Sequence, residues 1–153
     1  MEYSIGTIDD VYNIIGLYAQ LNASNYSDRF LMESGRIWKE IERCNIKYFL
    51  AKDNGTVIGS CYLCIIPNLT HNGKSIGYIE NLIVDENYRR KRIGQKIMEM
   101  AIDYAKNNNC YKIVLQSGIE RTIAHKFYEK MGFNSLSKKA YELRFKEIIP
   151  ILD

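Results

Sequence analysis

The strongest hydrophobic pattern of the chain lies between residues 76 and 105. Residues 76–84 (Ile-Gly-Tyr-Ile-Glu-Asn-Leu-Ile-Val) are apolar and β-branched enough to predict a largely buried strand. Beyond a basic turn, one apolar position recurs every four residues, at Ile93, Ile97, Ala101 and Ala105. That spacing predicts a helix with one apolar face. A buried strand therefore leads through a basic turn into a helix, and the rest of the chain is organised around this unit.

Alternation and helical periodicity predict further elements on both sides of that unit. We expect strands over residues 3–7, 46–52, 56–66, 111–116, 133–136 and 140–146, and helices over 9–22, 30–44 and 121–131. Asp9 is expected to cap the first helix. The residues Asp53-Asn54-Gly55 are typical of a hairpin turn, and Gly132 is typical of the residue that follows a helix end.

The bulk composition indicates one globular domain over residues 1–153, with 46% hydrophobic and 25% charged residues. No apolar run approaches about 20 residues and no leader-like pattern opens the chain, so we expect a soluble, cytoplasmic protein with no membrane partner. Its four cysteines suit a reducing compartment. Cys61 and Cys64 are three residues apart on a predicted strand and point to opposite faces, which favours packing over a metal or redox site. No metal is expected.

The turn at residues 89–92 carries four consecutive basic side chains, although the net charge is only +3. It lies where a buried strand meets a helix N-terminus. Unpaired backbone N–H groups and the positive end of the helix dipole converge at such a point, which makes it suitable for phosphate. The alternatives are a solvated basic turn and a patch that contacts the phosphates of a nucleic acid.

Two segments of the chain resemble motifs of the GNAT superfamily of acyl-CoA-dependent N-acetyltransferases. Residues 89–94 resemble its R-x-x-G-x-G signature, and residues 124–133 resemble its A-x-x-F-Y-x-x-x-G-F segment, in the family's order and spacing. The resemblance implies an α/β three-layer fold with a mixed, mostly antiparallel central sheet flanked by helices. Arg92 stands where the signature has its first glycine, which leaves Gly94 as the position where a pyrophosphate can approach the backbone without a Cβ.

The resemblance implies acetyl-CoA as the co-substrate and places its binding residues. The pantetheine arm is expected along the central strand at Leu82, Ile83 and Val84, with a main-chain N–H near Ile83 that holds the oxyanion. Arg121 occupies a position where many relatives have an asparagine that bonds this arm, so its guanidinium is expected on a phosphate or carbonyl. The phosphates are expected at the turn and the first helical residues, namely Arg89, Arg90, Lys91, Arg92, Ile93, Gly94 and Gln95.

Glu80 and Tyr128 are the candidate catalytic residues. Acetyl transfer needs a neutral amine, so a carboxylate near the thioester can take the amine proton. Glu80 lies within the apolar central strand, on the same side as Tyr78 and Leu82 by alternation, and matches the Glu of a Tyr-x-Glu-Asp-like segment in polyamine-acetylating relatives. Tyr128 matches the family's tyrosine that protonates the leaving thiolate. Alternatively, Glu80 faces solvent and Tyr128 only packs its helix on the sheet.

The predicted function is acetyl transfer from acetyl-CoA to a primary amine in a direct ternary complex, because no cysteine falls where the resemblance would place an acetyl-carrying nucleophile. The resemblance also implies that the first two helices form one wall of the acceptor site, and their aromatic side chains line that wall or pack the core. Small amines, polyamines, aminoglycosides and peptide amines all remain possible acceptors, and a homodimer is possible. The other hypotheses are an acyl-CoA sensor without turnover and, less favoured, a nucleic-acid-binding domain.

Overall fold

The computed structural model describes residues 1–22 and 26–145, apart from the side chains of residues 21 and 22. The chain divides into two compact units, residues 1–115 and 116–153, and each is described by itself. The sequence-based expectation of a single domain stays a prediction.

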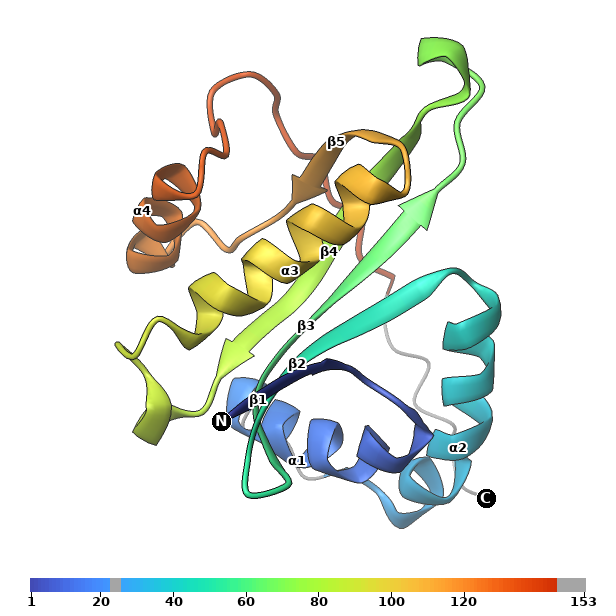
Figure 1. Cartoon of the computed structure of the whole chain (residues 1–153), viewed down its shortest axis with the longest axis vertical. Helices are drawn as coiled ribbons and strands as arrows, with labels where there is room; N and C mark the ends of the chain where they lie inside the picture. Colours follow the sequence, from blue (N-terminus) through green and yellow to red (C-terminus); the bar gives the residue numbers. More distant parts are fainter. Residues whose placement is uncertain (23–25, 146–153) are drawn as a thin grey trace. The chain divides into compact units, whose positions relative to one another are not determined.

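The first unit is built on a five-stranded sheet whose strands follow one another in chain order (Figure 1). Its strands are β1 (Glu2–Ile5), β2 (Ile46–Asp53), β3 (Thr56–Ile66), β4 (Ser75–Val84) and β5 (Cys110–Leu115). The pairings β1–β2, β2–β3 and β3–β4 are antiparallel, and β4 pairs with β5 in parallel. This confirms the predicted mixed, mostly antiparallel sheet of an α/β fold.

Helices cover both faces of this sheet. They are α1 (Val11–Asn22) and α2 (Asp28–Arg43) on one face and α3 (Ile93–Asn107) on the other (Figure 1). A Cβ added at Gly59 of β3 would meet Ile97 of α3, whereas Trp38 of α2 packs on Tyr48 of β2 from the opposite side. The predicted apolar stripe of α3 is confirmed, and its Ile97 and Ala101 are fully buried.

Two local predictions at turns and helix starts have different outcomes. Asn54 and Gly55 both have positive φ, 48° and 80°, as the predicted hairpin turn requires. The prediction that Asp9 caps the first helix is wrong. Asp10 is the residue that turns inward, and its Oδ2 accepts a hydrogen bond from the Thr7 backbone N–H at 3.0 Å. The Asp10 carboxylate also lies 2.6 Å from the Lys52 ammonium of β2, which favours its inward orientation.

The second unit contains α4 (Thr122–Lys130), which ends as predicted at Gly132 with φ 93°. The two strands predicted beyond it are wrong over the residues that are described, since 133–136 and 140–145 form no strand; residue 146 lies outside the described part. Tyr141, Leu143 and Phe145 alternate as in a strand, yet each is more than 80% exposed. Alternation specifies a strand only where a partner strand and an apolar surface are available to it.

Candidate active site

The central strand β4 carries an irregularity that alternation along the sequence does not reveal. Tyr62 pairs with Glu80 but Ser60 pairs with Ile83, so three steps on β4 match two steps on β3. The extra residue is accommodated by Asn81, whose φ is 54°. This arrangement is a β-bulge, which leaves a residue outside the hydrogen-bonded ladder. Because of it, Ile83 rather than Leu82 joins the core cluster with Trp38, and the expectation that Leu82 follows Tyr78 and Glu80 by alternation fails.

The second half of β4 is also released from its neighbour on the other side. The parallel pairing of β4 with β5 runs from Ser75 to Ile79, where Ile79 meets Leu115, the last residue of β5. Among the described residues, no strand pairs with β4 on this side beyond Ile79. The backbone of residues 80–84 therefore presents peptide groups that the sheet itself does not use.

The basic turn follows directly, and its backbone conformation is unusual for its side chains. Arg90 and Arg92 both lie in the left-handed region, with φ of 63° and 61°. Arg92 is the residue before α3, and its carbonyl accepts the first helical bond from Lys96 at 3.1 Å. All four basic side chains of residues 89–92 are exposed. Arg89 turns back to donate from Nε to the Val84 carbonyl at 3.2 Å, and the Lys91 ammonium lies 4.9 Å from the centre of the Tyr88 ring.

Gly94 stands at the start of α3, beside the end of β4. A Cβ at this position would meet Val84 Cγ2 at 3.4 Å, which is close to an ordinary van der Waals contact. At the end of β4, Ile83 is buried, whereas Leu82 and Val84 on either side of it are half-buried. Ile93 is buried and Gln95 is half-buried, with its amide bonded to Glu99 at 2.9 Å. The predicted phosphate and arm residues of the first unit thus form one continuous stretch of strand, turn and helix start.

Glu80 lies half-buried on the face of β4 that is turned toward α1 and α2. The Tyr78 hydroxyl donates a hydrogen bond to Glu80 Oε1 at 3.0 Å, which confirms that these two side chains share a face. Burial, followed by that hydrogen bond, raises the pKa of Tyr78 to about 12. Tyr62 is opposite Glu80 on β3, and burial together with the Glu80 charge raises its pKa as well.

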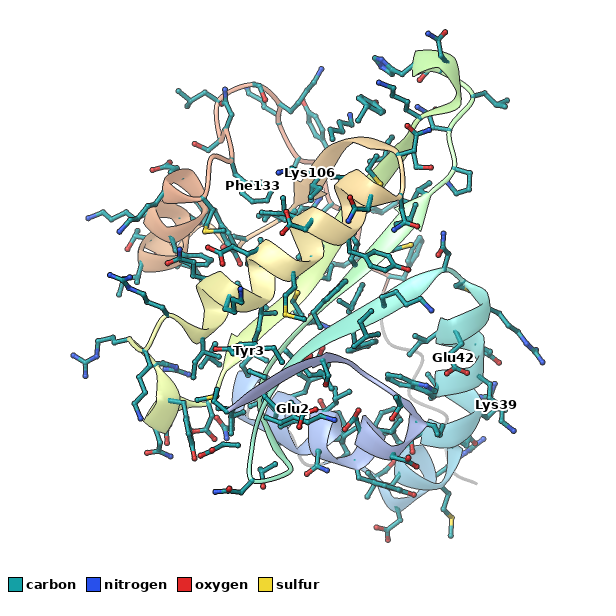
Figure 2. All side chains as sticks on the ribbon, in the orientation of Figure 1. Glu2, Tyr3, Lys39, Glu42, Lys106 and Phe133 are labelled. Carbon is teal, nitrogen blue, oxygen red and sulfur yellow. The ribbon has the colours of Figure 1, made fainter. Side chains whose placement is uncertain are left out.

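An aromatic row continues from Glu80 across the sheet to α2. Tyr48 of β2 is opposite Tyr62, and their ring centres are 5.4 Å apart. The Trp38 ring lies 5.2 Å from that of Tyr48 and donates its Nε1–H to Glu42 at 3.0 Å; Glu42 is labelled on α2 in Figure 2. Burial raises the pKa of Tyr48 to about 12. The sequence alone does not reveal this row, because the row depends on the register in which the three strands pair.

The aromatic side chains of the first two helices divide between core and surface. Trp38 is 5% exposed, and Tyr18 packs against the same core cluster as a partly buried side chain. Burial raises the pKa of Tyr18 strongly. Tyr26 and Phe30 stack on each other at 5.0 Å between ring centres. Cys61 and Cys64 are free thiols, the first buried and the second half-buried, as expected for packing residues.

The second unit carries the remaining predicted site residues. Tyr128 is half-buried on α4, with ring contacts to Phe127 at 5.4 Å and to Phe133 at 6.1 Å. Arg121 is exposed and immediately precedes α4. His125 lies one turn further, with Nε2 2.9 Å from the Gly118 carbonyl oxygen. Tyr128 therefore lies within α4 and Arg121 is the residue just before it, although the predicted helix began at residue 121.

Two other features are absent from the described part of the chain. None of the helices in residues 1–22 and 26–145 is long and apolar enough to cross a membrane. Over the same residues, no three His, Cys, Asp or Glu side chains are grouped so that they could hold a metal ion.

Comparison with known proteins gives consistent results. The model of the acetyltransferase (GNAT) family matches residues 10–133. A glucosamine 6-phosphate N-acetyltransferase of Trypanosoma brucei brucei is 34% identical over 89 residues, which is 58% of this chain and 58% of that protein. The chain thus spans less than two thirds of the length of this relative. An N-alpha-acetyltransferase 30 of Schizosaccharomyces pombe is 29% identical over 132 residues, 86% of this chain and 80% of that protein.

Solved structures agree with the sequence relatives. A putative acetyltransferase from Agrobacterium tumefaciens superposes with a TM-score of 0.86 at 28% identity, over 95% of this chain and 100% of that one. An acetyltransferase of Trypanosoma brucei superposes with a TM-score of 0.78 at 26% identity, over 95% and 98% of the two chains.

Proposed function

The chain belongs to the acetyltransferase (GNAT) family, and from this premise we propose that it transfers the acetyl group of acetyl-CoA to a primary amine in a direct ternary complex. The observation that carries the proposal is the released second half of β4. Its pairing with β5 ends at Ile79, its pairing with β3 is interrupted by the bulge at Asn81, and it leads straight into the basic turn. An extended ligand with an anionic end fits this arrangement.

The residues of the first unit fit acetyl-CoA in three respects. Leu82, Ile83 and Val84 offer strand backbone along which the pantetheine arm can bond. The turn from Arg89 to Arg92 supplies positive charge, and the backbone from Arg90 to Gln95 supplies N–H groups for the pyrophosphate. Gly94 keeps this backbone accessible, since it has no Cβ. Arg121 of the second unit is proposed to reach a phosphate or carbonyl of the same ligand.

The chain's own residues are proposed to move two protons. Acetyl-CoA supplies an activated thioester, whose C–S bond breaks as the bond between nitrogen and the acetyl carbon forms. Glu80 takes the proton that the amine loses, directly or through water. Tyr128 gives a proton to the departing sulfur. A main-chain N–H beside the bulge, near Ile83, stabilises the oxyanion, an effect worth roughly 3–4 kcal/mol in a site that excludes water.

Thermal unfolding with acetyl-CoA, CoA and ATP tests the co-substrate. A ligand at about 100 times its Kd stabilises the folded state by about 2.7 kcal/mol, which for a chain of this size raises Tm by roughly 5–10 °C. We expect this shift with both CoA compounds and little with ATP. No shift at saturating acetyl-CoA would contradict the proposal, and binding that weakens steeply with salt and ignores acetyl-CoA would support the nucleic-acid alternative.

Two variants then test the chemistry. Glu80→Gln and Tyr128→Phe should each lower kcat by about 10-fold or more, at the lower range of acid–base effects, with acetyl-CoA affinity kept. Charge reversal at Arg89 and Arg92, in contrast, should act on binding and weaken the affinity for acetyl-CoA severalfold. Acetyl-CoA binding with no turnover of any amine would instead support a sensor. An acetylated enzyme trapped without acceptor would contradict the ternary complex.

A further inference from the structure

Glu80 lies at the end of a row of aromatic side chains that crosses three strands. Tyr48, Tyr62 and Glu80 are in register on β2, β3 and β4, so all three point to the face covered by α1 and α2. Tyr78 stands two residues before Glu80 on the same face and is hydrogen bonded to it at 3.0 Å. Tyr62, Tyr78 and Glu80 are each half-buried, so each keeps part of its surface exposed.

The electrostatic character of this cluster is that of a cation site. Two phenols are coupled to Glu80, Tyr62 of β3 and Tyr78 of β4, and burial raises the pKa of both, so both are neutral at pH 7. Within the described residues, no Lys or Arg forms an ion pair or a hydrogen bond with Glu80. A half-buried carboxylate without a cationic partner attracts one from the ligand.

We propose that Tyr62, Tyr78 and Glu80 form the subsite for the acceptor's ammonium group, and that the acceptor is a primary amine that carries no phosphate near its nitrogen. This inference rests on the proposed function. Glu80 pairs with the ammonium before taking its proton, and the face of the Tyr62 ring supports the same positive charge. Tyr78 is a positioning residue: its hydroxyl holds one carboxylate oxygen and leaves the other for the amine.

The inference distinguishes this chain from its sugar-phosphate relatives. A phosphorylated amine would bring two negative charges to a subsite whose only formal charge is a carboxylate, and none of the cluster's own residues would compensate for them. An amine on a neutral or cationic carrier meets no such repulsion. The four basic side chains of residues 89–92 do not offset this repulsion, because they lie beyond the C-terminal end of β4 and are proposed to bind the co-substrate.

Steady-state kinetics with three acceptors tests the substrate class. Putrescine, a short peptide with a free N-terminus and glucosamine 6-phosphate are compared at one ionic strength, with calorimetry of each amine on the CoA-bound protein. We expect putrescine or the peptide, and not glucosamine 6-phosphate, to give the higher kcat/KM and measurable binding; the ratio between the first two tells a small amine from a peptide. A higher kcat/KM for glucosamine 6-phosphate, or no binding of any amine to the CoA-bound protein, would overturn the inference.

Substitutions at Tyr62 test its ring, with a matched tyrosine as control. Tyr62→Leu should raise the Kd and KM of the preferred amine about 2–5-fold, as expected for loss of a cation–π contact, whereas Tyr62→Phe keeps the ring and should change both by less than 2-fold. Tyr12→Leu alters an exposed tyrosine of α1, 66% exposed, and should change neither. Equal effects of Tyr62→Leu and Tyr62→Phe would refute the ring's role.

Tyr78 is tested by comparing kcat with the affinity for acetyl-CoA. In Tyr78→Phe the carboxylate of Glu80 loses the hydrogen bond that orients it, so kcat with the preferred amine should fall severalfold, and the acetyl-CoA Kd should stay the same. An unchanged kcat would exclude the positioning role. If the unmodified protein does not bind acetyl-CoA, the proposed function itself is refuted. Failure of the proposed function can therefore be distinguished from failure of this inference.

Discussion

Arg92 shows how a sequence departure can preserve a backbone conformation. The family signature has a glycine at this position, and the structure explains the preference, because φ is +61° there. For a residue with a Cβ, the left-handed conformation costs roughly 1–2 kcal/mol. The chain accepts that cost and gains a fourth positive charge beside the start of α3. The loop therefore keeps the shape that glycine would give it, which the sequence alone left open.

The backbone strain at Arg92 predicts the sign of a stability change. Arg92→Gly removes the unfavourable φ and adds chain entropy to the unfolded state, which costs about 0.5–1 kcal/mol. The two effects should leave the free energy of unfolding unchanged or raised by up to about 1.5 kcal/mol. Lys91→Gly is the control, because Lys91 has no positive φ, and it should destabilise by about 0.5–1 kcal/mol. Urea unfolding measures both, and a clear loss in Arg92→Gly would contradict the argument.

Gly59 is required by packing rather than by conformation. A Cβ there would lie 2.7 Å from Ile97 Cδ1 and 3.2 Å from Ile93 Cγ2, both on α3. Gly59→Ala should therefore destabilise by about 1–3 kcal/mol, because the buried Ile97 and Ile93 side chains, or α3 with them, must shift. Gly16→Ala is the matched control in α1, where a Cβ meets nothing within 4 Å, and it should stabilise by about 0.5–1 kcal/mol. Thermal unfolding of the two variants should give Tm shifts of opposite sign.

At the scale of elements, one ion pair joins the start of α1 to β2. Asp10 and Lys52 are 2.6 Å apart, with side chains only 8% and 17% exposed. Burial raises the pKa of Asp10, but the hydrogen bonds from Lys52 and Thr7 and the Lys52 charge outweigh it and lower the pKa overall. Because the folded pKa is lower than the unfolded one, the stabilisation is fully present above the unfolded pKa of about 3.9. It is lost as pH falls through the folded pKa.

Asp10→Asn tests this connection. The variant leaves the Lys52 charge buried without its partner, so we expect a loss of about 3 kcal/mol at pH 7. Between about pH 4.5 and pH 2, the variant's stability should fall less steeply than that of the unmodified protein. Glu40→Gln is the control: Glu40 pairs with Arg36 at 2.7 Å, but both are more than half exposed, so the change should be below about 0.5 kcal/mol. Parallel pH slopes in Asp10→Asn and the unmodified protein would contradict the assignment.

Helices and strands with an uninterrupted hydrophobic pattern could be predicted from the sequence, whereas irregularities within a strand, such as a bulge, could not. The α3 stripe and the β2–β3 hairpin were predicted because their signals are local. The bulge at Asn81 was not, since asparagine tolerates a positive φ but does not demand one, and the register with β3 decides it. For the same reason Glu80 could be identified from the sequence as a carboxylate within an apolar strand. Its neighbour Tyr62 could be identified only from the pairing of β3 with β4.

At the scale of the whole molecule, burial is concentrated in the first unit. Leu50, Cys61 and Leu63 of the central strands are fully buried, whereas the apolar side chains of residues 136–145 in the second unit are exposed. The candidate residues are divided in the same way, with Glu80 and the basic turn in one unit and Tyr128 in the other.

Amide hydrogen exchange gives the test at this scale. In the protein without ligand, amides of β3 near Leu63 should exchange most slowly, close to the rate set by global unfolding, because they are buried between two neighbouring strands. Amides of residues 136–145 should exchange near their intrinsic rates, since over these described residues no strand protects them. Saturating acetyl-CoA should slow exchange in residues 82–95 and on α4. Alternating protection at Tyr141, Leu143 and Phe145 without ligand would show that this segment pairs as a strand and would contradict the architecture described for it.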